Sequence, residues 1–143
     1  METRLVSVTR LRVRSWRFLP AFFIRVFRSA LQAKRAPGNL AVTILREANK
    51  TFWTRTAWVD EKAMKAFILA GPHRGAMKRL LDWCDEASVV RWIQDVAELP
   101  SWEEAYRRMR EEGRPSKVHF PSADHVAFRI APIRTGSTGL RLR

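Results

Sequence analysis

Residues 40–59 have the sequence LAVTILREANKTFWTRTAWV, and this stretch decides the fold. Leu40, Val42 and Ile44 recur at every second position within residues 40–47, which is the two-residue period of a β-strand. Residues 52–59 are predicted to form a second strand. Because the connection around Asn49-Lys50 is so short, the two strands must pair as an antiparallel hairpin.

The sequence on either side of the hairpin adds two strands and two helical regions. Strands are predicted at 6–15 and 88–96, an amphipathic helix at 20–34, and helical segments at 60–71 and 72–83. The resulting order is β-α-β-β-α-β, which is the ferredoxin-like α+β plan, with two helices on one face of a four-stranded antiparallel sheet. The other face is expected to stay open. A second copy of the chain is its simplest cover, so we expect a homodimer.

Two regions are predicted along the chain. Residues 1–113 form the ferredoxin-like domain and end in a helix whose first turn carries the capping-box pattern of Ser101 and Glu104. Residues 114–143 are expected to be a basic extended tail, with one more extended segment at 119–133 and a loose end around residues 135–139.

The chain is strongly basic, with 27 Lys and Arg against 14 Asp and Glu and a net charge of +13. Residues 1–35 hold nine basic groups and a single acidic one. Such charge can indicate nucleic-acid binding, but the aromatic strand motif of RNA-recognition modules is absent, so nucleic acid is an unlikely partner. An anionic ligand or an anionic membrane surface fits equally well. The basic, Phe-rich helix 20–34 could contact a membrane peripherally, or its Phe residues could pack on the sheet.

One cysteine, Cys84, excludes an internal disulfide framework and is predicted to pack inertly, because no basic neighbour lowers its pKa. The apolar run at residues 18–24 is far shorter than the roughly 20 residues that span a bilayer. We expect a cytoplasmic protein.

Two groups of residues are candidates for a site on their chemistry alone. Trp53, Trp58 and Phe67 could line a pocket for a flat apolar ligand, although aromatic residues at such positions are often plain core, and parity places the two tryptophans on opposite sheet faces. Arg12 and Arg14 could clamp an anion, or they could pair with acids of an adjacent strand.

Several motifs resemble a known family. They are TRLRVRS (9–15), TFWTRTAWVDE (51–61), AF (66–67), GPHRGAM (71–77) and PSWEEA (100–105). The chain resembles the small bacterial family related to spheroidene monooxygenase, within the dimeric α+β barrel superfamily that also holds antibiotic-biosynthesis monooxygenases. This resemblance implies a homodimer with a ligand pocket between the sheet and the helices.

The resemblance also implies a cofactor. Spheroidene monooxygenase is haem-dependent and oxidises a long apolar carotenoid, and haem-degrading members of the superfamily hold iron through a histidine on the second helix. On this resemblance, His73 would be the iron ligand or the acid–base residue. Met77, four residues later in the sequence, falls at the position where the haem degraders have their ligand. Arg12 and Arg14 would hold the haem propionates.

The sequence therefore favours a haem protein or oxygenase acting on an apolar substrate. Oxygenation without a cofactor, which is known in the superfamily, remains open, because it needs only a pocket that stabilises a substrate anion. The alternative is a module of the same fold that binds a small apolar or anionic ligand without chemistry.

Overall fold

The computed structural model describes residues 3–133 and 138–142, apart from the side chains of residues 71–73, 76, 138 and 140. The central strands are β1 (Arg4–Val13), β2 (Asn39–Glu47), β3 (Thr51–Trp58) and β4 (Cys84–Gln94). A short 3-10 turn (Trp16–Phe18) precedes α1 (Leu19–Arg35), and the second helical region is divided into α2 (Glu61–Ile68) and α3 (Gly71–Trp83). The predicted order of strands and helices is confirmed.

The strands form one antiparallel sheet in the order β5-β4-β1-β3-β2-β6. Its four central strands have the ferredoxin-like order, and the two outer ones come from the C-terminal region. β5 (Arg114–Pro115) pairs with β4, and β6 (Thr138–Arg141) pairs with β2. A short helix, α5 (Ala123–Ala127), replaces the extended segment expected at 119–133. Much of the region from 114 onward is thus folded onto the domain. Of the loose end predicted around 135–139, residues 135–137 lie outside the described residues, and residues 138–139 belong to β6.

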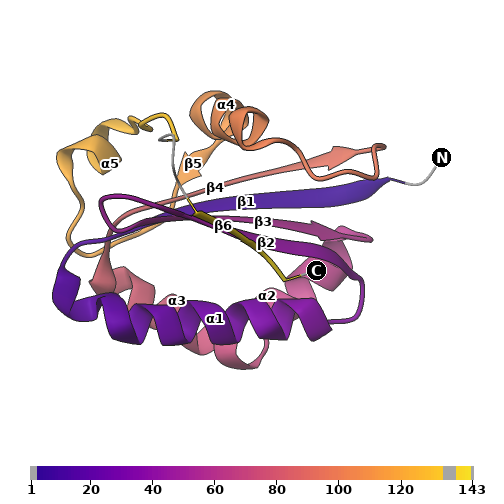
Figure 1. Cartoon of the computed structure of the whole chain (residues 1–143), viewed down its shortest axis with the longest axis horizontal. Helices are drawn as coiled ribbons and strands as arrows, with labels where there is room; N and C mark the ends of the chain where they lie inside the picture. Colours follow the sequence, from indigo (N-terminus) through magenta and orange to yellow (C-terminus); the bar gives the residue numbers. More distant parts are fainter. Residues whose placement is uncertain (1–2, 134–137, 143) are drawn as a thin grey trace.

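Helices α1, α2 and α3 cover one face of the sheet, called the inner face below (Figure 1). Phe22 of α1 is fully buried and its ring centroid lies 4.9 Å from that of Phe52 on β3. Its neighbours Phe23, Ile24 and Phe27 keep between 37% and 60% of their surface exposed. Packing on the sheet therefore accounts for only some of the apolar side chains of α1. Peripheral membrane contact of this helix stays a prediction. Among the described residues, no helix is both long and apolar enough to cross a membrane.

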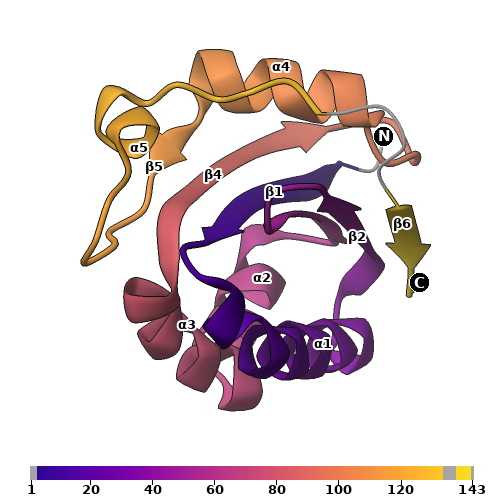
Figure 2. The same cartoon turned by 60° about the vertical axis from the view of Figure 1, so that its left-hand side comes forward.

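The opposite, outer face is not open over β4 and β1, which corrects the prediction. Helix α4 (Trp102–Glu112) lies across these strands, with α5 beside it (Figure 2). Its Ala105 and Met109 are fully buried against Val6, Val8 and Trp53. The chain thus supplies part of the cover that was assigned to a second copy, and the homodimer stays a prediction.

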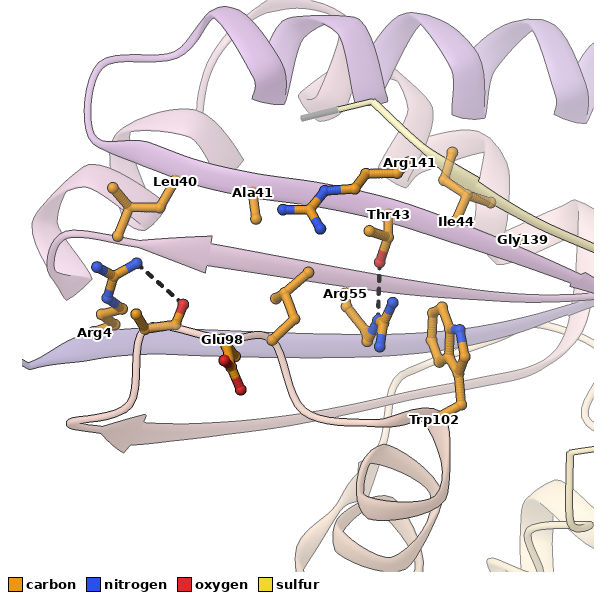
Figure 3. Close-up of a pocket in the computed structure, with 12 residues that line it drawn as sticks. Arg4, Leu40, Ala41, Thr43, Ile44, Arg55, Glu98, Trp102, Gly139 and Arg141 are labelled. Carbon is orange, nitrogen blue, oxygen red and sulfur yellow. Dashed lines mark hydrogen bonds between the residues drawn. The ribbon is translucent and has the colours of Figure 1, made fainter.

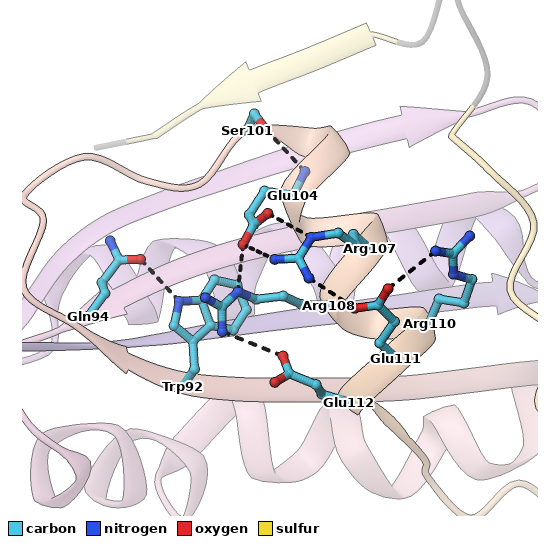
Figure 4. A network of polar contacts seen from close by, with 9 residues as sticks. All are labelled: Trp92, Gln94, Ser101, Glu104, Arg107, Arg108, Arg110, Glu111 and Glu112. Atoms are coloured by element: carbon cyan, nitrogen blue, oxygen red, sulfur yellow. Dashed lines mark hydrogen bonds and ion pairs between the residues drawn. The ribbon is translucent and has the colours of Figure 1, made fainter.

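Polar contacts fix α4 at its start and along its length (Figure 4). The Ser101 hydroxyl accepts a hydrogen bond from the backbone N–H of Glu104 at 3.1 Å, as the capping box predicts. Hydrogen bonds donated by Arg107 and Arg108 lower the pKa of the Glu104 carboxyl. The Arg108 guanidinium also stacks 4.4 Å from the ring of Trp92 on β4, which ties the helix to the strand below it.

The turn between α1 and β2 depends on Gly38. Its φ of +85° lies in the left-handed region, and an added Cβ would stand 2.6 Å from the Cβ of Ala63. Any side chain here would strain the backbone and push α2 away.

We therefore expect Gly38→Ala to lower the free energy of unfolding by about 1–3 kcal/mol, measured by urea denaturation. Gly75→Ala is the matched control, because that glycine lies in α3 and its added Cβ meets nothing closer than an Arg25 nitrogen at 3.5 Å. The control should be neutral or more stable by up to about 1 kcal/mol. Equal losses in both variants would contradict this account of the turn.

Candidate functional site between the sheet and the helices

Strand parity decides which side chains face the helices. On β1, Ser7, Thr9 and Leu11 face inward, while the residues between them face outward. Thr9 stands opposite Thr54 of β3 in the antiparallel register, so the inner face carries hydroxyl groups at its centre. Two apolar clusters flank this patch, one around Phe22 and Phe52 and the other around Trp58.

An inner cavity of about 380 Å³ lies over the hydroxyl-bearing patch. Its walls come from β1–β4, from α1–α3 and from residues 116–118. The rings of Trp58 and Phe67 stack at one side of it, with centroids 5.1 Å apart and 28° between their planes. Apolar surface dominates the lining, which suits a small apolar ligand.

A few polar groups are placed in this apolar lining. The Ser29 hydroxyl on α1 is buried and has no hydrogen-bond partner among the described residues, so it can serve a ligand. Arg91 and Lys117 lie at the exposed rim. Partial burial, together with the charge of Arg114, lowers the pKa of Arg91, which remains cationic at neutral pH. The cavity can therefore hold an apolar body with a negatively charged end at the rim.

The structure brings together three of the predicted site residues. Trp58, Phe67 and Met77 all line the inner cavity, and Met77 remains 46% exposed. Trp53 does not line it. Its ring is buried on the outer face, where Nε1 donates a hydrogen bond to Glu47 Oε1 at 2.5 Å. Parity correctly predicted opposite faces for the two tryptophans, so only one of them could form a wall of this cavity.

Arg12 and Arg14 also lie outside the inner cavity, and their prediction as clamps for an anion there is corrected. Arg12 faces outward and pairs with Glu86 at 2.9 Å and with Asp85 at 3.8 Å. Arg14 follows the strand; its Nε donates to the backbone carbonyl of Asp82 at 2.5 Å, and its guanidinium stacks on Phe120. The alternative prediction for the arginine strand, ion pairs with an adjacent strand, is the one observed for Arg12.

His73 belongs to the first turn of α3, four residues before Met77, but its side chain lies outside the described residues. Its role as iron ligand or acid–base residue stays a prediction. The described lining does not fit the haem site that the resemblance implies, because both predicted propionate clamps are elsewhere and Met77 is its one side chain able to ligate iron axially. Within the described part of the chain, no three His, Cys, Asp or Glu side chains gather closely enough to hold a metal ion.

A buried carboxylate organises the outer face beneath α5. Glu86 accepts hydrogen bonds from Arg10 at 2.7 Å, Arg12 at 2.9 Å and the Ser122 hydroxyl at 2.8 Å. Burial alone would raise the pKa of Glu86, but these donors outweigh it and hold the pKa below the ordinary value of 4.5. The buried charge of Arg10 is neutralised in the same way.

Glu86→Gln should lower the free energy of unfolding by about 3–5 kcal/mol at pH 7, because it leaves Arg10 buried without a counter-charge. In the wild type, the stabilisation that Glu86 contributes to the free energy of unfolding is fully present above pH 4.5. It is lost as the pH falls through the lower pKa of Glu86 in the folded state. In urea denaturation below pH 4.5, the variant should not show this acid-dependent loss of unfolding free energy.

Glu61→Gln is the control, because Glu61 forms an exposed ion pair with Lys65 on α2. Its loss should change the free energy of unfolding by no more than about 0.5 kcal/mol. An equally small change in Glu86→Gln would contradict a stabilising role for the buried cluster.

Cys84 is fully buried at the start of β4, as the prediction of inert packing requires. Burial, with the nearby charge of Asp85, raises the pKa of the thiol to about 12. At pH 8 we expect the folded protein to react with an aromatic disulfide reagent roughly a hundredfold more slowly than the urea-unfolded chain. Comparable rates in the two states would show that β4 opens or that the thiol is accessible.

Comparison with known families identifies the chain. A family profile described as a domain of unknown function, DUF3291, matches residues 23–127. The chain belongs to the DUF3291 family. The matched residues run from α1 to α5, so this family includes the helix that covers the outer face. No curated protein sequence matches the chain.

Solved structures place this DUF3291 protein in the fold of the antibiotic-biosynthesis monooxygenases. A candidate monooxygenase of that class from Nitrosomonas europaea is 22% identical, with a TM-score of 0.57, covering 62% of this chain and 88% of the other. A variant of SnoaB, a cofactor-independent oxygenase from Streptomyces nogalater, is 18% identical, with a TM-score of 0.53 and coverages of 66% and 94%. The protein PA3566 from Pseudomonas aeruginosa is 10% identical, with a TM-score of 0.60 and coverages of 67% and 98%. These likenesses show a shared ferredoxin-like α+β fold.

Sequence reasoning missed most of the polar residues of the inner cavity. The hydroxyls of Thr9 and Thr54 could have been found from strand alternation, because they share parity with Leu11 and Trp58 on their strands. Arg91 lies on a predicted strand and could have been found in the same way. Lys117 gave no signal, since residues 116–118 have no periodicity and reach the cavity only through the tertiary fold.

Proposed function

We propose that this protein is an oxygenase that acts on a small, largely apolar substrate bound in the inner cavity. The observation that carries the proposal is the cavity itself, which has aromatic and aliphatic walls, an unpartnered buried hydroxyl and two cations at its rim. The shared fold supports the proposal, because one protein of similar structure is described as a cofactor-independent oxygenase.

The side chains of the cavity suggest how a substrate would lie. A flat ring would lie against the stacked pair of Trp58 and Phe67. An oxygen atom of the substrate that gains negative charge would face Arg91 at the rim, where a fixed cation stabilises an enolate or phenolate. The Ser29 hydroxyl could donate a hydrogen bond to a second oxygen.

Such an arrangement suits a substrate that supplies its own electrons. In the simplest case a methylene group beside a carbonyl loses a proton, and the carbanion reacts with O2. The CH2 group and O2 become C=O and H2O, so neither an external reductant nor a bound cofactor enters the balance. The described lining contains no carboxylate or imidazole to accept the first proton. His73 remains the candidate acid–base residue on α3.

The finer proposal, a haem protein related to spheroidene monooxygenase, has only the sequence motifs as support. Titration of the protein with haem tests it directly. A shifted Soret band that is lost in His73→Ala would support haem ligation by that residue. Unchanged spectra in both proteins would remove the haem version and leave the cofactor-free one.

Oxygen consumption separates the oxygenase from a binding module of the same fold. The protein is mixed with a panel of aromatic ketones that have an acidic methylene, and O2 uptake is measured with ketone formation. We expect one quinone-type product per O2 consumed. Saturable binding without O2 uptake for any ligand of the panel would instead favour the binding module.

The rim cation gives the oxygenase a specific test. Arg91→Gln should reduce kcat/KM about tenfold for a substrate that becomes anionic, because one charge at the developing oxyanion is removed. Arg79→Gln is the control, since Arg79 is an exposed cation of α3 outside the cavity lining. Equal kcat/KM values for the two variants would rule out a role for Arg91.

A further inference from the structure

Helix α1 runs along the sheet in the layer of helices (Figure 1) and carries two apolar rows. The buried row packs against the strands and consists of Leu19, Phe22, Ala30 and Ala33. The second row consists of Phe23, Ile24 and Phe27, which keep 37%, 60% and 46% of their surface exposed. Large apolar side chains that gather in this way on the surface of one helix indicate a contact with something else.

A groove of about 960 Å³ between α1 and α2 continues the exposed row. Leu31 stands one helical turn after Phe27 and forms part of the groove wall. The facing wall is largely apolar and includes Pro37, Ala63, Ala66 and Phe67. The exposed row and this groove together are called the α1 surface below.

Exposed cations border the α1 surface. Arg28 and Arg35 of α1 and Lys62 of α2 line the groove. None of these three side chains forms an ion pair or a hydrogen bond with another described residue. At the exposed row, the Arg46 guanidinium of β2 lies 5.3 Å from the ring centroid of Phe23. The α1 surface is therefore an apolar strip with positive charge along its borders.

One acidic residue belongs to the described lining of the groove. It is Asp60, whose carboxylate accepts a hydrogen bond from the backbone N–H of Ala63 at 2.8 Å and so caps α2. Between residues 14 and 35, the sequence contains no Asp or Glu. The charge of the α1 surface thus favours an anionic partner.

The combination of charge and apolar surface decides between three kinds of occupant. A second copy, placed symmetrically, would bring the cations of both copies close together, and they would repel each other. A nucleic acid would pair with the cations but leave the exposed apolar row in water. At an anionic bilayer, the apolar row enters the boundary between head groups and acyl chains, and the cations meet the lipid phosphates.

We propose that the α1 surface binds the protein peripherally to an anionic lipid membrane. Phe23, Ile24 and Phe27 enter the bilayer interface, and Arg28, Arg35 and Lys62 contact its head groups. Because α1 also forms a wall of the inner cavity, bound protein would hold that cavity beside the phase in which an apolar molecule dissolves. The membrane contact itself does not depend on the proposed oxygenase, and its test involves no turnover.

The outer face of the sheet has a different character (Figure 3). An outer pocket of about 580 Å³ lies there, between β2, β3, β6 and the loop of residues 97–102, and it is lined in part by Arg4, Arg55 and Arg141. Arg55 donates hydrogen bonds to the Thr43 hydroxyl at 2.9 Å and to the Pro100 carbonyl at 2.5 Å. Arg4 donates to the Ala97 carbonyl at 3.3 Å. These two arginines hold the loop in place, which leaves α1 as the better surface for a membrane.

Vesicles of phosphatidylcholine, with or without about one third phosphatidylglycerol, are the probe in a sedimentation assay at physiological ionic strength. The protein should partition at least tenfold more strongly onto the anionic vesicles. Ile24→Ser and Phe27→Ser should each weaken this binding about tenfold. Arg28→Gln and Arg35→Gln should each weaken it about fivefold, because each removes a cation near the head groups.

The matched controls lie on the other side of the sheet. Val126→Ser replaces an apolar side chain of α5 that is 74% exposed, and Arg110→Gln removes an exposed cation of α4. Both variants should bind vesicles as the wild type does. The variants of α1 replace exposed side chains, so their far-ultraviolet circular dichroism should remain that of the folded protein.

A fluorescent label tests whether the exposed row enters the bilayer. Ile24→Cys is labelled with a dye whose emission depends on polarity, and the native Cys84 does not compete because it is fully buried. Anionic vesicles should shift the emission to the blue. The same label on Val126→Cys should show no shift.

Four outcomes would overturn the proposal. Unchanged binding in Ile24→Ser and Phe27→Ser would reduce the effect to diffuse attraction of a basic protein. An unshifted label at position 24 on vesicle-bound protein would assign the contact to another surface. Retention on DNA without vesicle binding would make the cations a nucleic-acid surface. A lipid-free oligomer that dissociates in Phe27→Ser, again without vesicle binding, would make the α1 surface a contact between copies of the chain.

Discussion

The buried carboxylate of Glu86 decides which way the first strand faces. Arg10 and Arg12 cannot be buried without counter-charges, and Glu86 on the neighbouring strand supplies one on the outer face. Because side chains alternate along a strand, fixing these arginines outward forces Ser7, Thr9 and Leu11 toward the helices. The polar and apolar composition of the inner cavity is therefore a consequence of an ion cluster on the opposite side of the sheet.

The C-terminal region turns a one-sided sheet into a two-sided domain. Helix α4 buries Val6, Val8 and Trp53, and α5 contributes Ser122 to the Glu86 cluster. The cover is incomplete, and over β2 and β3 the outer pocket remains instead of a packed core. The two faces consequently differ in chemistry, since the inner cavity is largely apolar and the outer pocket is lined by arginines and a tryptophan.

Sequence patterns predicted the fold well, but they predicted the residues of the site only in part. The hairpin at 40–59 and the Ser101 cap appear as predicted, because each depends on residues close together in the chain. Trp58 and Phe67, which the sequence suggests as pocket walls because of their aromatic side chains, both line the inner cavity. Trp53, Arg12 and Arg14 were also named as site residues but lie outside the inner cavity. No local pattern states which parity of a strand faces the helices. The side chain of His73 lies outside the described residues, so its role stays open to the haem titration.

The sequence by itself determined the order of strands and helices, the antiparallel hairpin and the opposite placement of the two tryptophans of β3, since alternation and turn chemistry are local properties. Only the tertiary structure decided which face of the sheet carries the cavity, because that choice depends on Glu86 meeting arginines more than seventy residues away. It also decided that residues 102–133 fold back over the outer face and that Arg4, Arg55 and Arg141 share one pocket. Contacts between residues so far apart in the chain leave no periodic signal, since each strand could satisfy its own pattern with either face turned inward.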